Sequence, residues 1–147
     1  MIQVIEQDTI KLLRECDAGV KMGVDSIEDV IDDVKSDTLR NYLETCKSGH
    51  EKLDREIQDL LQCYDDDGKD PNPVAKGMSW IKTNAKMMVD CSDATIAELM
   101  TDGCNMGVKS LSRYLNQYKA ADEQSKDIAR RLISLEERLA IDIRKYL

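Results

Sequence analysis

The chain contains one histidine, His50, with Cys46 four residues before it. Residues four apart on a helix share one face, so these two side chains have a spacing that can chelate a metal ion. Folding each half of the chain about its central turn places Cys104 level with Glu136, and makes Glu136 the counterpart of His50. A mixed nitrogen, oxygen and sulfur set suits zinc better than a hard cation. His50 and Glu136, with Cys104 or Cys46, are therefore candidate ligands for a single zinc or iron ion.

The alternative interpretation is an apolar core that holds one buried polar network around His50. Catalytic motifs are absent: the chain has no glycine-rich phosphate loop, no His-Glu-x-x-His and no second histidine. A nucleophile pair of Cys46 and His50 would be buried in the middle of a helix, without access for a substrate. We name no catalytic residue and no cofactor-binding residue, and the sequence favours a protein that is not an enzyme.

The elements that position these residues come from an internal repeat. Residues 19–27 and 103–111 each carry a Gly-x-x-x-Gly pair followed by Val, a charged residue, Ser and a branched aliphatic residue. Residues 50–57 and 136–143 share a second pattern, with Leu in the fourth place and Ile in the eighth. Each helical glycine costs about 1 kcal/mol relative to Ala, and close helix approach would offset that cost. The repeat predicts one helical hairpin used twice.

Hydrophobic periodicity predicts four long helices. They run from about Asp8 to Val34, from Ser36 or Asp37 to about Tyr64, from Ser92 or Asp93 to about Lys119, and from about Asp122 to Tyr146. A shorter helical piece, about Val74 to Met88, contains the only Trp. Two hairpins (about residues 8–64 and 92–146) joined by a crossover (about 65–91) form the ferritin-like variant of the four-helix bundle. We therefore expect an all-α, single-domain protein over residues 1–147.

Each predicted helix has an apolar seam, which is a row of residues three or four positions apart that faces the other helices. Two details of these seams stay open. The seam of the first helix passes through Asp17, but a rotation by one position would bring Cys16 there instead, and Gly103 and Cys104 pose the same choice on the third helix. The fourth seam includes Asp142. A buried carboxylate without a partner is costly, so Asp17 and Asp142 should be paired, bound to a ligand, or turned outward.

The acidic stretch 65–70 predicts a solvated loop. Its glycine, Gly68, would take the sixth place of a calcium-binding loop, but Cys63 and Val74 would then occupy the first and twelfth places. Neither side chain offers a useful oxygen ligand, so the calcium pattern fails.

Composition excludes several classes of function. The 147 residues include 34% charged residues, no Phe and two Pro, which is typical of a helical protein with an aliphatic core. A net charge of −8 argues against nucleic acids and anionic membranes as partners. No apolar run is long enough to span a membrane, and no signal peptide is evident. Five cysteines without a Cys-x-x-Cys pair indicate reduced thiols and a cytoplasmic location.

The chain resembles a family of bacterial ferritin-like proteins of unknown function, distantly similar to rubrerythrins. The resemblance covers essentially the whole chain and rests on Cys16-Asp-Ala-Gly19 with Glu28-Asp-Val30, Asp37-Thr-Leu39, Pro73-Val-Ala-Lys-Gly77-Met-Ser-Trp80 and Leu99-Met-Thr-Asp-Gly103.

Ferritin-like di-iron proteins use a Glu on each of the first and third helices and Glu-x-x-His on the second and fourth. If His50 is the histidine of the second helix, the remaining positions hold Lys47, Ile133, Glu136, Val20 and Cys104. The resemblance therefore implies a degenerate di-iron site. It also implies a binding or structural role through self-association or a protein partner, with a single zinc or iron site as the alternative.

Overall fold

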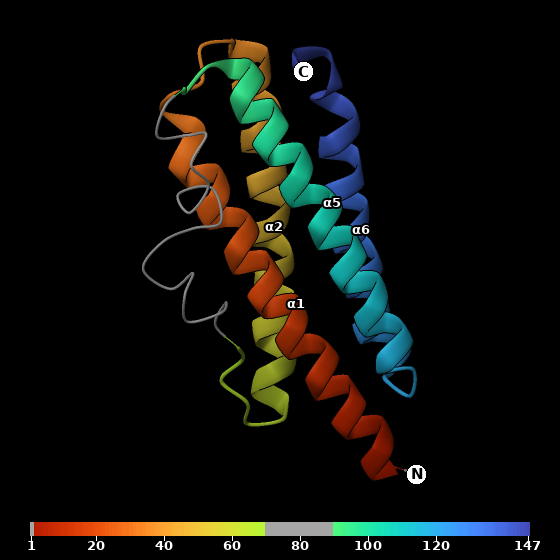
Figure 1. Cartoon of the computed structure of the whole chain (residues 1–147). Coiled ribbons are helices and arrows are strands. Elements are labelled where there is room, and N and C mark those ends of the chain that lie inside the picture. Colours follow the sequence, from red (N-terminus) through yellow and green to blue (C-terminus); the bar gives the residue numbers. More distant parts are fainter. Residues whose placement is uncertain (1, 70–89) are drawn as a thin grey trace.

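The chain forms four long helices in the computed structural model, which describes residues 2–69 and 90–147 (Figure 1). The helices are α1 (Ile2–Ile31), α2 (Asp37–Cys63), α5 (Asp93–Gln117) and α6 (Glu123–Asp142), and α6 is followed by a short 3₁₀ turn, Arg144–Tyr146. No strand occurs within the described ranges, so the all-α prediction is confirmed. The short helix predicted at 74–88 lies outside those ranges. None of the helices in the described part is both long and apolar enough to cross a membrane.

Side chains cap the starts of three helices. The side-chain oxygens of Ser36, Ser92 and Asp122 accept hydrogen bonds from the backbone N–H three residues further on. The start of α1 differs from the prediction, because the helix begins at Ile2 rather than near Asp8. The carboxylate of Asp8 accepts a hydrogen bond from the backbone N–H of Ala120, in the turn between α5 and α6 (3.1 Å). Asp8 thus stabilises the other hairpin rather than starting its own helix.

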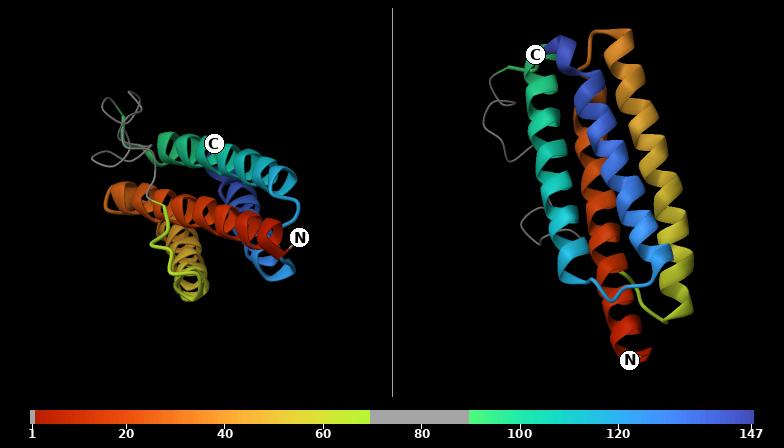
Figure 2. Two further views of the ribbon diagram at one scale, coloured as in Figure 1. Left: turned by 90° about the horizontal axis from the view of Figure 1, so that it is seen from below. Right: turned by 90° about the vertical axis from the view of Figure 1, so that its right-hand side faces the viewer.

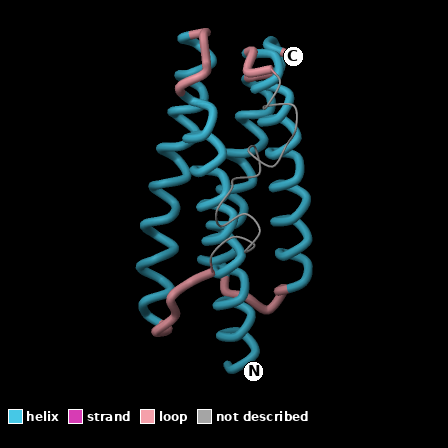
Figure 3. The backbone as a smooth tube through the Cα atoms, turned by 60° about the vertical axis from the view of Figure 1, so that its left-hand side comes forward, coloured by secondary structure: helices cyan, strands magenta, loops and turns pink. Residues whose placement is uncertain are grey.

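Two antiparallel hairpins, α1–α2 and α5–α6, pack side by side (Figure 2). The carboxylate of Asp93, the first residue of α5, accepts hydrogen bonds from the backbone N–H groups of Lys35 and Ser36 at 2.8 and 2.9 Å. These bonds place the start of α5 at the same end of the bundle as the start of α2, so these two helices run in the same direction (Figure 1). Figure 3 shows the turns within the two hairpins at the ends of the bundle. Helix α1 contacts all three other helices.

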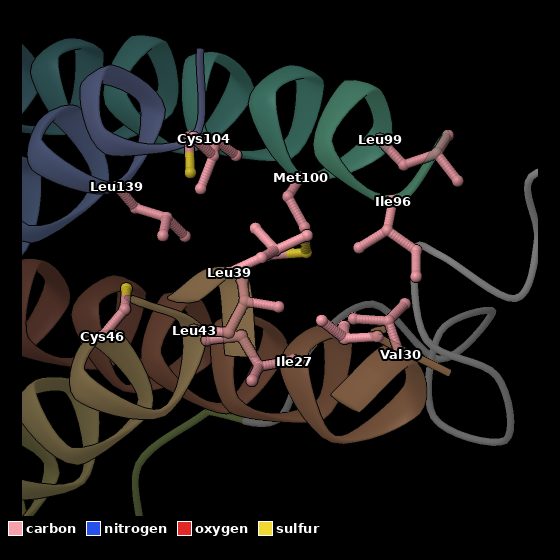
Figure 4. Close-up of a cluster of buried hydrophobic side chains, with 12 residues drawn as sticks. Ile27, Val30, Leu39, Leu43, Cys46, Ile96, Leu99, Met100, Cys104 and Leu139 are labelled. Carbon is pink, nitrogen blue, oxygen red and sulfur yellow. The ribbon is translucent and has the colours of Figure 1, made fainter. Parts of the chain in front are cut away.

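The core consists of two apolar clusters stacked along the bundle. The cluster near the α1–α2 turn includes Ile27, Leu43, Cys46, Cys104 and Leu139 (Figure 4). The cluster at the other end is built from the following buried side chains: Leu12, Leu13, Cys16, Val20, Leu53, Ile57, Leu61, Leu111, Ala121, Ile128, Ala129 and Leu132. On each of these helices, the residues between these two sets form a separate layer, and that layer contains His50 and Glu136.

The seams agree with the prediction on α2 more closely than on α1 and α6. Cys16 and Asp17 are both buried, because α1 packs against three neighbours and buries a face wider than a single seam. Cys104 rather than Gly103 is buried on α5. Asp142, which interrupts the seam of the fourth helix, is half-buried, and the neighbouring Ile143 is completely buried in the core.

Candidate functional site

A histidine–glutamate pair occupies the layer between the two apolar clusters. His50 on α2 and Glu136 on α6 lie with Nε2 and Oε1 2.8 Å apart, and His50 is 1% exposed. The other ring nitrogen, Nδ1, lies 2.8 Å from the backbone carbonyl oxygen of Cys46. A carbonyl only accepts, so Nδ1 carries a hydrogen and donates it to Cys46. Both ring nitrogens therefore have partners inside the bundle.

The proton between His50 and Glu136 is held firmly. Burial alone lowers the pKa of His50, but the hydrogen bonds to Cys46 and Glu136 outweigh burial and raise the pKa to about 10. The carboxylate stabilises the charged ring because the two groups lie in direct contact in a medium of low dielectric constant. At neutral pH the ring of His50 therefore keeps both of its protons and is an imidazolium.

Two glycines make room for this pair. A Cβ atom on Gly23 of α1 would lie 2.8 Å from Cδ2 and Nε2 of His50 and 3.6 Å from Oε1 of Glu136. A Cβ atom on Gly107 of α5 would lie 3.5 Å from Cδ of Glu136. Contacts under 3.0 Å require something to move, whereas 3.5 Å is an ordinary contact. Gly23 is therefore required by the position of the His50 ring, and Gly107 borders Glu136 without being required.

Two buried thiols complete the surroundings of the pair. The sulfur of Cys46 lies 3.6 Å from Nδ1 of His50, on the side of the ring opposite to Glu136. Cys104 on α5 lies beside Glu136: burial raises the pKa of its thiol, and the charge and hydrogen bonding of Glu136 raise it further. The structure thus brings all four candidate ligands, His50, Glu136, Cys104 and Cys46, into one neighbourhood.

These residues are not already arranged as a metal cage. Within residues 2–69 and 90–147, no group of three or more His, Cys, Asp or Glu side chains has its donor atoms placed to hold a metal ion. The atoms Nε2 and Oε1 instead bond directly to each other.

Asp17 lies at the centre of a second buried polar network. Sequence analysis identified Asp17 but not its partners. Its carboxylate is completely buried and accepts hydrogen bonds from three groups: Lys21 Nζ at 2.9 Å, Gln58 Nε2 at 2.7 Å and the backbone N–H of Lys69 at 2.9 Å. The expectation that Asp17 should be paired is confirmed. The predicted acidic loop is exposed at Asp65, Asp67 and Lys69, while Gly68 is half-buried against α1.

The loop reaches Asp17 through Gly68. Its φ angle is +84°, and a Cβ atom there would lie 2.3 Å from Oδ2 of Asp17. Asp54 belongs to the same network: burial raises its pKa, Gln58 lowers it, and Asp17 raises it further. The carboxylate in an apolar seam was the one sequence signal for this network, and it did not identify Gln58 or Asp54 as partners.

The donor set does not fit a di-iron centre. Lys47, at the glutamate position of α2, forms an ion pair with Glu28 of α1 at 3.2 Å. Val20 lies in the apolar core, and Ile133 packs against it. A pair of irons needs several bridging carboxylates, and Glu136 is the one carboxylate at these positions. Comparison with models of known protein families, with curated proteins and with solved structures finds no match for this chain.

Proposed function

We propose that this chain is a non-catalytic, ferritin-like bundle with a degenerate di-iron site, and that it acts as a binding or structural protein in the bacterial cytoplasm. One observation carries the proposal: His50 and Glu136 bond to each other in the middle layer, and glycines and cysteines adjoin them where a di-iron protein would place carboxylates. Both ring nitrogens of His50 have partners, so this ring is not available as a free base.

The order of the helices supports the ferritin-like assignment. Helices α2 and α5 begin at the same end of the bundle, because Asp93 binds the turn from which α2 starts. The end of α2 and the start of α5 therefore lie at opposite ends, as a long connection between two hairpins requires.

Iron content tests the degenerate site. The full-length chain would be produced without a tag in medium supplemented with iron and zinc, and its metal content measured by elemental analysis. We expect fewer than two irons per chain, because Glu136 is the one carboxylate at the ligand positions. Two irons per chain, with the absorption of an oxo-bridged pair, would contradict the proposal.

Self-association is the form of binding that the surface of α1 supports best. The N-terminal turns of α1 project beyond the turn between α5 and α6 (Figure 2). Ile2 and Ile5 are 81% and 44% exposed, and they continue the seam that leads through Thr9 into the core. A second copy of the chain, with its own projecting α1, offers a matching apolar surface.

Sedimentation velocity over a range of concentrations tests this surface. We expect the wild type to associate and the double variant Ile2→Lys/Ile5→Lys to remain monomeric. Ile141→Lys is a matched control, since Ile141 is 55% exposed on α6, away from the projecting turns. A monomeric wild type at all concentrations would rule out self-association, and equal loss in both variants would show that this surface is not responsible.

A further inference from the structure

The two hairpins of the bundle bind each other's turns in the same way. The carboxylate of Asp93 on α5 accepts a hydrogen bond from the backbone N–H of Ser36, the N-cap residue of α2 (2.9 Å). At the matching places of the repeat, the hydroxyl of Thr9 on α1 accepts one from the backbone N–H of Asp122, the N-cap residue of α6 (2.9 Å). Such reciprocal contacts are those of two hairpins related by an approximate twofold axis.

Two pairs of matching residues meet at this axis, where the antiparallel helices α2 and α6 lie against each other (Figure 1). His50 and Glu136 hold matching places in the repeat, 86 residues apart, and their side chains are in contact. One residue earlier on each helix, a Cβ atom on Gly49 would lie 2.8 Å from Cδ2 of Leu135. A residue that contacts its own counterpart lies on the axis. The axis pairs are therefore His50–Glu136 and Gly49–Leu135.

Both axis pairs join unlike partners. In one pair a ring bonds to a carboxylate, and in the other a leucine fills the space that a glycine leaves. If two copies of α2 met in this way, two rings and two glycines would face each other. Nδ1 of His50 donates to the backbone carbonyl of Cys46, so two facing rings could offer each other only lone pairs, or one shared proton and a buried positive charge. Two copies of α6 would likewise bring two carboxylates and two leucines together.

We propose that the axis pairs select the partner of each hairpin, so that the first hairpin pairs with the second and not with a second copy of itself. The two hairpins share a repeated sequence, so burial of their apolar faces favours like and unlike pairing to a similar degree. Unlike pairs at the axis separate these alternatives, as a buried polar residue does in coiled coils. Like pairing would join two chains, so the axis pairs favour a bundle formed within one chain. This inference does not depend on self-association through α1.

The two members of the polar axis pair can exchange places, which makes the selection testable. Gly107 presents no side chain to Glu136, and the backbone carbonyl of Leu132 lies one turn before Glu136 as an acceptor for Nδ1 of an introduced ring. The double variant His50→Glu/Glu136→His should therefore restore the contact in reverse order. Each single variant instead sets like groups against each other.

Urea denaturation compares the full-length wild type with His50→Glu, Glu136→His and the double variant. Each single variant should lower the folding equilibrium constant at least about 100-fold, because a buried group loses its complement. The double variant should recover at least about tenfold of that loss. Glu56→Arg is the matched control: it sets like charges between α2 and α6 at a surface pair with Arg131, and should lower the constant less than about tenfold. A single variant as stable as the wild type, or no recovery in the double variant, would overturn the proposal.

Refolding the two single variants together tests selection between chains. Both carry Ile2→Lys/Ile5→Lys, so that the exposed turns of α1 do not contribute to association. In the mixture, the first hairpin of each chain complements the second hairpin of the other. We expect sedimentation velocity to show heterodimers that neither variant forms alone, a result that can be read even where a single variant does not fold by itself. A mixture without heterodimers, refolding no better than its components, would overturn the proposal.

Discussion

At the scale of single residues, glycines on two helices border the pair of His50 and Glu136. Gly23 on α1 and Gly107 on α5 border it, and they differ in the space that they leave. Gly19 resembles Gly107, since a Cβ atom there would make an ordinary 3.7 Å contact with Leu132. Alanine would gain the same helix propensity at all three positions, but the space available for its methyl group differs from one position to the next.

Alanine at these positions should change stability with opposite signs. Gly19→Ala and Gly107→Ala should each raise the free energy of unfolding by about 0.5–1 kcal/mol, because alanine favours the helix. Gly23→Ala should lower it by about 1–3 kcal/mol, because the added methyl group displaces the His50 ring. Urea denaturation measures all three. Stabilisation by Gly23→Ala would show that His50 is not held where the structure places it.

The stability of the metal-free protein should fall as pH rises through the alkaline range. The pKa of His50 is about 10 in the folded chain against an ordinary value of 6.5, so the folded state keeps a proton that the unfolded state loses. Its contribution is complete below pH 6.5 and is lost as pH approaches about 10. Between pH 6.5 and 8.5, we expect a decrease of up to about 1.4 kcal/mol per pH unit.

The control for this pH dependence is His50→Gln. The difference between the two proteins isolates His50 from other titrating groups. Burial raises the pKa of the Cys16 thiol to about 12 and also raises that of Cys104, so both thiols add a decrease of their own as pH rises towards and above their ordinary pKa, and this decrease is common to the two proteins. Parallel pH profiles of the wild type and the variant, after chelator treatment, would contradict the strong hydrogen bond between His50 and Glu136.

At the scale of elements, Asp17 joins helix α1 to α2 and to the loop that follows α2. Asp17→Asn should lower the free energy of unfolding by about 1–3 kcal/mol, because an amide nitrogen replaces one acceptor of a fully buried group. Hydrogen exchange should show lost protection at the amide of Lys69. Asp67→Asn, at an exposed position of the same loop, is the control and should change neither quantity. Retained protection of Lys69 would show that Asp17 does not hold the loop.

The helices and the central pair could be predicted from sequence, but the breadth of each buried face could not. A seam with one residue every three or four positions predicts a narrow stripe, and α2, with two principal neighbours, follows it closely. Helix α1 contacts three helices, so it buries Cys16 and Asp17 together and leaves Ile10 and Val24 half-buried. The number of neighbours is a property of the assembled bundle.

The candidate site was predictable in its members and not in its geometry. The repeat made Glu136 the counterpart of His50 and proposed that both reach the middle of the bundle, where the two are in contact. The position of Cys46 on the Nδ1 side depends on the rotamer of His50, and the role of Gly23 depends on the rotation of α1. Partners of Asp17 were equally hidden, because Gln58 and Lys69 are polar residues that the pattern assigns to solvent.

At the scale of the whole molecule, each hairpin stabilises the turn of the other. Asp93 of the second hairpin binds Lys35 and Ser36 in the first turn, while Asp8 of the first hairpin binds Ala120 in the second turn. These reciprocal bonds lie at opposite ends of the bundle, with the layer of His50 and Glu136 between them. Such links should make the four helices unfold as one cooperative unit.

Asp93→Ala and Asp8→Ala, singly and together, test this cooperativity. Asp93→Ala should cost more, about 1–2 kcal/mol, because it frees two backbone N–H groups where Asp8→Ala frees one. Since the sites are far apart, the double variant should lose the sum of the two within about 0.5 kcal/mol. In each case circular dichroism and tyrosine fluorescence should follow a single urea transition. Two separate transitions would show instead that the hairpins unfold independently, and that the chain is not a single domain.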